Sequence, residues 1–243
     1  NSALDGDFLA EGEAINISNA GKLNLTAATA DSEIAGTIAV TGRDSSLSIA
    51  GVGTAALTGQ ISLADNADLF VESTLNVEKD GVIFAGGKSS SAAVSVEAGS
   101  ILNLNEGSSL ALTDGSHLIN KGAVNVNGGT VTLQSNGYIR NMGTSTTFNG
   151  GQFNIETDAL IDGGFVFSTK TTGIKIKDAT VTFAAGVLGF GNVTMTGEGN
   201  ATARIEGVWN GATQTQYAQD VIEIADDFAI DNFAFEAIND STV

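Results

Sequence analysis

Residues 121–133 read Lys-Gly-Ala-Val-Asn-Val-Asn-Gly-Gly-Thr-Val-Thr-Leu, and this stretch decides the fold. It holds two short segments, Val124–Val126 and Val131–Leu133, in which two apolar residues flank a polar one. Alternation with a period of two places the apolar pair on one face of a strand. Each segment is therefore predicted to be a short strand with its outer pair in the core. The Gly-Gly pair between the segments predicts a turn.

The same triplet recurs along most of the chain, and successive triplets start about 6 to 9 residues apart. Strands this short do not suit an antiparallel sandwich, in which strands usually have about 5 or 6 residues. They fit a coil of three strands and about 20 to 24 residues, stacked on the next coil in parallel at about 4.8 Å. We therefore predict an all-β fold, a right-handed parallel β-helix (solenoid) with three short strands per coil, about 10 or 11 coils and a length of about 50 Å. The other triplets are Leu23–Leu25, Leu47–Ile49, Ile61–Leu63, Leu75–Val77, Val94–Val96, Leu102–Leu104, Leu110–Leu112, Phe153–Ile155, Phe165–Phe167, Ile174–Ile176, Val181–Phe183 and Val193–Met195.

The composition supports a continuous aliphatic core with tight turns. Hydrophobic residues make up 42% of the 243 residues and aromatic residues only 6%, so we expect a core built mainly from Val, Ile, Leu and Ala. With 31 Gly and no Pro, the turns are expected to use Gly, Asn and Asp, which tolerate positive φ. The absence of Cys excludes disulfides, thiol catalysis and cysteine-ligated metals. Outward strand positions are often Asn, Ser or Thr, which can form hydrogen-bonded ladders between coils, and the recurring Asn residues are Asn16, Asn24, Asn76, Asn103, Asn125 and Asn154.

The net charge limits the partners. Ten basic and 28 acidic residues give a formal charge of −18. Such a surface repels nucleic-acid phosphates and anionic lipid, so neither is an expected partner. The sequence has no apolar run as long as a membrane-spanning helix, so we expect no membrane insertion of this segment.

The pattern divides the chain into two regions. Residues 1–207 are predicted to form the solenoid, and residues 208–243 a C-terminal cap or altered coils of the same solenoid. The second region begins at Val208-Trp209-Asn210-Gly211 and continues into an acidic, Phe-rich stretch. Residues 216–226 are the best candidate for a helix. Trp209, the only Trp, is expected to be buried at the end of the coil stack, and the alternative is an exposed ring that stacks on a sugar.

The stretch at residues 121–133 and the segment Asn149-Gly-Gly-Gln-Phe-Asn-Ile155 resemble the passenger domains of bacterial autotransporters, the proteins of type V secretion. The low charge fraction, the absence of Cys and the Gly-Gly turns are similar too, and the resemblance covers residues 14 to 205. It implies an adhesin-like module, a self-association module or a scaffold that is secreted or displayed on the bacterial cell surface. The Asn-Pro motifs of two-partner secretion adhesins are absent, because the chain has no Pro.

No group of residues predicts a catalytic site, so we expect no enzyme, no catalytic residues and no cofactor. His117 is the only histidine and is expected to be a surface turn residue, since one histidine cannot build a multi-histidine zinc site. A β-helix glycosidase would need two carboxylates at a defined separation in a groove, and a lyase would need clustered Lys or Arg. The carboxylate pairs are Asp5/Asp7, Glu11/Glu13, Asp65/Asp68 and Asp226/Asp227, and the arginines Arg43, Arg140 and Arg204 are scattered.

Two further motifs offer a calcium site and an ice-binding face as alternatives to ordinary surface structure. Residues 65–68 read Asp-Asn-Ala-Asp and offer oxygen ligands for calcium, but the glycine-rich calcium repeat is missing, so a solvated turn and no metal site are predicted. Ice binding would need one Thr-x-Thr pair per coil in register, and the spacing of the pairs is uneven. These pairs are Thr130/Thr132, Thr144/Thr146, Thr180/Thr182, Thr194/Thr196 and Thr213/Thr215.

The function expected from the sequence is a structural or adhesive β-helix module that associates with itself or binds a host or matrix glycan or protein. The alternatives are a carbohydrate-active β-helix enzyme and an ice-binding solenoid. The facing of the strands gives a direct check: Leu104, Val126 and Ile155 should point inward, and Asn103, Asn125 and Asn154 outward.

Overall fold

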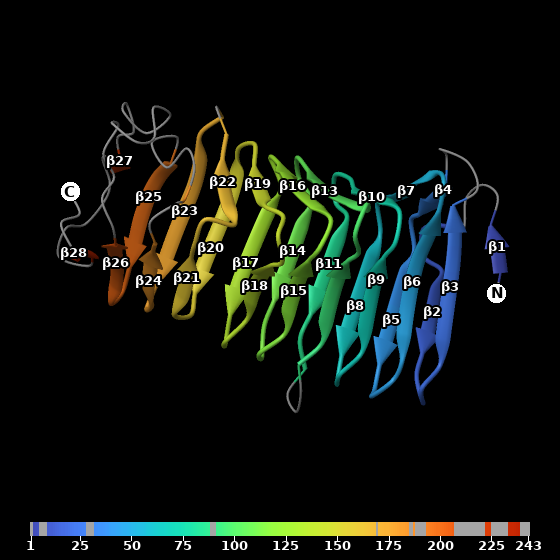
Figure 1. Cartoon of the computed structure of the whole chain (residues 1–243). Coiled ribbons are helices and arrows are strands. Elements are labelled where there is room, and N and C mark those ends of the chain that lie inside the picture. Colours follow the sequence, from blue (N-terminus) through green and yellow to red (C-terminus); the bar gives the residue numbers. More distant parts are fainter. Residues whose placement is uncertain are drawn as a thin grey trace.

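A computed structural model describes residues 2–4, 9–27, 32–87, 91–168, 170–184, 187, 193–206, 222–224 and 233–238. These residues form a parallel β-solenoid with three strands per coil (Figure 1). The predicted all-β class and the three-stranded coil are confirmed. The part of the chain that the structure describes contains no helix, and hence none with the length and apolarity needed to cross a bilayer.

The strands form four parallel sheets, named A to D here. Sheet A contains β1 (Ser2–Leu4), β3 (Lys22–Ala27), β6 (Ser46–Gly51), β9 (Asp68–Val71), β12 (Ala93–Val96), β15 (His117–Asn120) and β18 (Tyr138–Asn141). Sheet B contains β4 (Ser32–Ile34), β7 (Thr54–Leu57), β10 (Thr74–Val77), β13 (Ile101–Asn105), β16 (Ala123–Asn127), β19 (Thr146–Phe148) and β22 (Phe165–Phe167). Sheet C contains β2 (Ala14–Ile17), β5 (Thr37–Thr41), β8 (Gln60–Ala64), β11 (Val82–Ala85), β14 (Ser109–Leu112), β17 (Thr130–Gln134), β20 (Gly151–Glu156), β23 (Thr172–Lys177), β25 (Val193–Glu198) and β27 (Ile222–Ile224). Sheet D contains β21 (Ala159–Ile161), β24 (Thr180–Phe183), β26 (Ala201–Glu206) and β28 (Phe233–Ile238).

The coils are less uniform than the sequence pattern predicted. Asn103 lies 27 residues after its ladder neighbour Asn76, whereas Asn125 lies 22 residues after Asn103. Near the C-terminus Val193 pairs with Ile222, so that coil is longer still. Sheet C nevertheless stacks ten strands, from β2 to β27, which agrees with the lower of the expected 10 or 11 coils.

The alternation of each strand places its apolar residues inside. Leu104, Val126 and Ile155 have no exposed surface, whereas the polar neighbours in their strands are half-buried on the outer face, which confirms the predicted facing. Aliphatic side chains fill most of the core, as expected. Later coils add buried phenylalanines, and Phe148 stacks on Phe153 and Phe167 with ring centroids 4.9 and 5.4 Å apart.

The turns use the residues that the composition predicted. Positive φ occurs at many Gly and, among other residues, mainly at Asn and Asp, as in the pair Asp65 (φ 56°) and Asn66 (φ 63°). Other glycines are needed for close packing between coils. At Gly59, an added Cβ would clash with the backbone carbonyl oxygens of Ala35 and Gly36 in the preceding coil.

The described parts of the C-terminal region continue the sheets. β27 pairs in parallel with β25, and β28 pairs in parallel with β26. The predicted helix at residues 216–226 is wrong at residues 222–224, where the backbone pairs as strand β27. Trp209 and the rest of that helix prediction lie outside the described residues.

On one face of the solenoid, sheet A is replaced by sheet D partway along the chain. Sheet A ends at β18, and the next strand on the chain's third face, β21, begins sheet D. Sheets B and C run through the same two coils without interruption, because β16 pairs with β19 and β17 pairs with β20. In the described residues, only sheet C thus runs along the whole solenoid, whereas sheet B ends at β22 and the third face is divided between sheets A and D.

Candidate functional site

Two parallel ladders of asparagine side chains lie on the outer face of sheet B, over its middle strands. In the first ladder, Asn103 Nδ2 donates to Asn76 Oδ1 at 2.8 Å, and Asn125 Nδ2 donates to Asn103 Oδ1 at 2.9 Å. These residues lie directly opposite one another in the register of β10, β13 and β16. The ladder predicted from the recurring Asn triplets therefore exists on this sheet.

The second ladder runs beside the first, two residues further along the chain in each coil. Asn105 Nδ2 donates to Glu78 Oε2 at 3.0 Å, Asn127 Nδ2 to Asn105 Oδ1 at 3.4 Å, and Asn149 Nδ2 to Asn127 Oδ1 at 2.8 Å. The recurring triplets by themselves do not predict this second ladder. Its signal was the double alternation Leu-Asn-Leu-Asn and Val-Asn-Val-Asn, which places two Asn residues of one strand on the same face.

The chemistry of this surface follows from the amide group. Each amide nitrogen carries two hydrogens and each amide oxygen has two lone pairs, and the ladder uses only one of each. The half-buried amides keep one donor and one acceptor each for a partner, repeated at about 4.8 Å along the solenoid. Only Glu78 among the ladder side chains is charged.

The remaining recurring asparagines do not join these ladders. Asn16 belongs to sheet C and Asn24 to sheet A. Asn154, on sheet C, donates instead to Thr132 Oγ1 at 3.3 Å. The triplet pattern identified outward positions correctly, but it did not determine which of them become neighbours.

His117 differs from its prediction. It is the first residue of strand β15, not a turn residue, because the turn is completed earlier by Asp114 (φ 55°) and Gly115 (φ 75°). Its half-buried ring stacks on Tyr138 of the next coil, with centroids 5.0 Å apart and planes inclined by 10°. Its Nδ1 is buried and has no hydrogen-bond partner.

A hollow of about 420 Å³ lies beside this stacked pair on sheet A. Its lining includes Arg43, Asp44, Asn66, Asp68 and His117. Burial raises the pKa of Asp68, His117 lowers this pKa by a smaller amount, and Asp44 raises it slightly. The hollow is thus open to solvent, mostly polar, and bordered by a planar ring.

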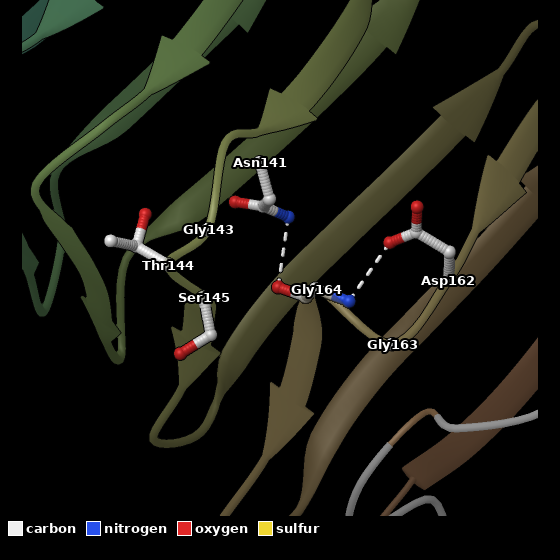
Figure 2. A pocket seen from close by; sticks show the side chains of 7 residues that line it. All are labelled: Asn141, Gly143, Thr144, Ser145, Asp162, Gly163 and Gly164. Carbon is white, nitrogen blue, oxygen red and sulfur yellow. Dashed lines mark hydrogen bonds between the residues drawn. The ribbon is translucent and has the colours of Figure 1, made fainter.

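A second hollow, of about 460 Å³, lies where sheet A ends. Figure 2 shows Asn141, at the end of β18, turned toward the loop that precedes β22, where its Nδ2 donates to Gly164 O at 2.8 Å. Beneath it, the fully buried Asn120 donates through Nδ2 to Asn141 Oδ1 and to Ser145 O, both at 3.0 Å. These side-chain amides bond to loop carbonyls where sheet A stops, so we interpret this network as structural.

The carboxylate pairs named from the sequence do not form one site. Glu11 and Glu13 are both exposed near the N-terminus, and Glu13 Oε2 accepts a hydrogen bond from Ala10 N at 3.1 Å. Asp65 lies in a turn and Asp68 in strand β9. The pairs Asp5/Asp7 and Asp226/Asp227 lie outside the described residues. Across the described ranges, no three His, Asp or Glu side chains are grouped to hold a metal ion.

The Thr-x-Thr pairs are spread over different faces. Thr130/Thr132 and Thr194/Thr196 lie on sheet C, and Thr180/Thr182 lies on sheet D. Thr146 points into the core and is fully buried. Thr213/Thr215 lies outside the described residues. The described pairs therefore do not share the single flat face that ice binding requires.

One charged cluster lies on sheet C. Glu198 forms ion pairs with both Lys175 and Lys177, and hydrogen bonds from these lysines lower the pKa of Glu198 to about 2. The cluster is solvent-exposed and joins two neighbouring strands, β23 and β25.

Comparisons with known proteins add no family. No family model matches the sequence, and neither the curated proteins nor the solved structures include a significant match.

Proposed function

We propose that this chain is a secreted or surface-exposed structural and adhesive module that associates with itself through the outer face of sheet B. The observation that carries the proposal is the pair of in-register amide ladders on that face. A single amide hydrogen bond contributes only about 0.5 to 1.5 kcal/mol net, but a rod repeats it along its length.

A second copy of the same face is a suitable partner on grounds of hydrogen bonding and charge. The amide array presents donors and acceptors in equal numbers, so it is complementary to itself. The whole chain carries a formal charge of −18, and two copies repel each other over about a Debye length. A nearly neutral face is where two copies approach with the least repulsion.

The test is analytical ultracentrifugation between about 10 and 150 mM salt, where screening should strengthen association. Asn125→Asp adds a charge to the ladder face and should weaken association about tenfold. Asn154→Asp is the matched control, because Asn154 is also half-buried and outward but lies on sheet C. It should associate like the unmodified protein. A strict monomer at every salt concentration, or equal effects of the two variants, would refute self-association through sheet B.

The proposal places the protein outside the bacterial cell or on its surface, in keeping with its resemblance to autotransporter passenger domains. Cells that express the full-length protein should then lose this domain to protease added outside intact cells, and they should clump when the domain is displayed. Protection from the protease until the cells are lysed would contradict the location.

The proposal also includes no hydrolase or lyase activity. Incubation with a panel of polysaccharides should release no reducing ends or unsaturated products. Turnover of any glycan that is abolished by Asp68→Asn would overturn this part of the proposal and favour the carbohydrate-active enzyme.

A further inference from the structure

An outward row of side chains on sheet A forms the hollow beside His117. Asp68, Ala93, His117 and Tyr138 occupy one register position on four successive strands. The ring of His117 stacks on that of Tyr138, whereas the side chain of Ala93 is only a methyl group. The short side chain of Ala93 between two longer ones accounts for the hollow at this point of the row.

The register sets the width of this hollow. Neighbouring strands are about 4.8 Å apart, so the backbones at Asp68 and His117 are separated by about 9.6 Å. One face of the imidazole is covered by Tyr138, and the opposite face is on the side of Ala93. A six-membered ring placed over Ala93 therefore has an aromatic face on one side and a carboxylate on the other.

We propose that this hollow binds a neutral pyranose ring of a glycan. The C–H face of a pyranose is apolar and matches the imidazole face, while its hydroxyl edge matches a carboxylate that accepts two hydrogen bonds. Asn66 and Arg43 line the same hollow and supply donors for other hydroxyls. This ligand class needs both a planar stacking surface and several polar groups, and the hollow combines them.

Charge selects against acidic sugars. Asp44 and Asp68 both border the hollow, against one cationic side chain, Arg43. Two carboxylates beside one guanidinium leave the hollow with an excess of negative charge, so a carboxylate on the ligand would be repelled. Neutral hydroxyls instead satisfy the carboxylate. The site lies on sheet A and is independent of the self-association proposed for sheet B.

Saturation-transfer NMR tests the proposal with methyl glycosides of glucose, galactose, mannose and N-acetylglucosamine, together with methyl glucuronide. Because His117 is the only histidine, its ring protons give a single reporter signal in the protein spectrum. At least one neutral glycoside should bind and shift this signal. The glucuronide should bind at least about tenfold more weakly.

Two pairs of variants locate the site. Ala93→Leu fills the hollow and should weaken binding about tenfold or more, whereas Ala111→Leu makes the same change at a half-buried outward position on sheet C and should not. His117→Ala should weaken binding to a similar degree, and His117→Phe, which keeps an aromatic face, should restore it. The proposal fails if no neutral glycoside shifts the His117 signal, or if Ala93→Leu binds like the unmodified protein. Equal binding of the glucuronide would overturn the selection for neutral sugars.

Discussion

Replacing Val126 with Asp, beside a matched change of Asn125 to Asp, tests the facing of strand β16. Val126 has no exposed surface, and its register neighbours are Leu104 in the preceding coil and Phe148 in the following coil. Asn125 is adjacent in sequence but half-buried on the outer face. The two changes introduce the same side chain one residue apart.

The expected magnitudes follow from these surroundings. At Val126 the change removes about 1.5 to 3 kcal/mol of apolar burial and places a carboxyl group among apolar side chains without a hydrogen-bond partner. We expect a total loss of about 3 to 5 kcal/mol in the free energy of unfolding. At Asn125 the change removes the hydrogen bond from Nδ2 to Asn103 Oδ1, which is 2.9 Å long. Water can reach the new carboxylate there, so the expected loss is about 1 kcal/mol.

Urea denaturation at neutral pH, followed by circular dichroism, measures both losses. The Val126→Asp variant should show a much lower transition midpoint than the Asn125→Asp variant, which should unfold close to the unmodified protein. Equal shifts of the two midpoints would mean that the assigned facing of β16 is wrong.

Three further predictions concern turns, the aromatic core and pH. Gly59→Ala should lower the urea midpoint more than Gly99→Ala, because a Cβ at Gly59 clashes with the backbone of the preceding coil. A Cβ at Gly99 meets nothing within 4 Å and adds only the strain of a positive φ (82°), about 1 to 2 kcal/mol. Equal losses would contradict this packing. Phe148→Ala should destabilise the fold by about 3 to 5 kcal/mol, and Phe148→Leu by clearly less, as measured by urea denaturation. The carboxyl of Glu198 should titrate near pH 2 in NMR, well below its ordinary pKa of 4.5. Because this pKa is lowered in the folded state, the stability that Glu198 contributes should be present above about pH 4.5 and be lost as pH falls toward 2. An NMR titration midpoint near 4.5 would show that the two lysine contacts are absent in solution.

Strand facing was predictable from the sequence because it is a local property. The side-chain period of two requires only that neighbouring residues alternate, and this is why Val126 and Asn125 were assigned correctly to opposite faces. The turn residues were predictable for the same reason, since positive φ depends on the residue itself. The parallel solenoid followed because strands this short bury their apolar pairs by stacking coil upon coil.

What only the tertiary structure decided is which outward residues become neighbours. Two residues meet across coils only if all the turns between them add up to the right length, and that length varies from 21 to 27 residues between hydrogen-bonded side chains. The sequence therefore indicated outward asparagines but not that Asn103 lies between Asn76 and Asn125 while Asn154 lies on another sheet. It likewise gave no sign that His117 stacks on Tyr138, or that sheet A ends at β18, because both depend on the register between coils rather than on any local pattern.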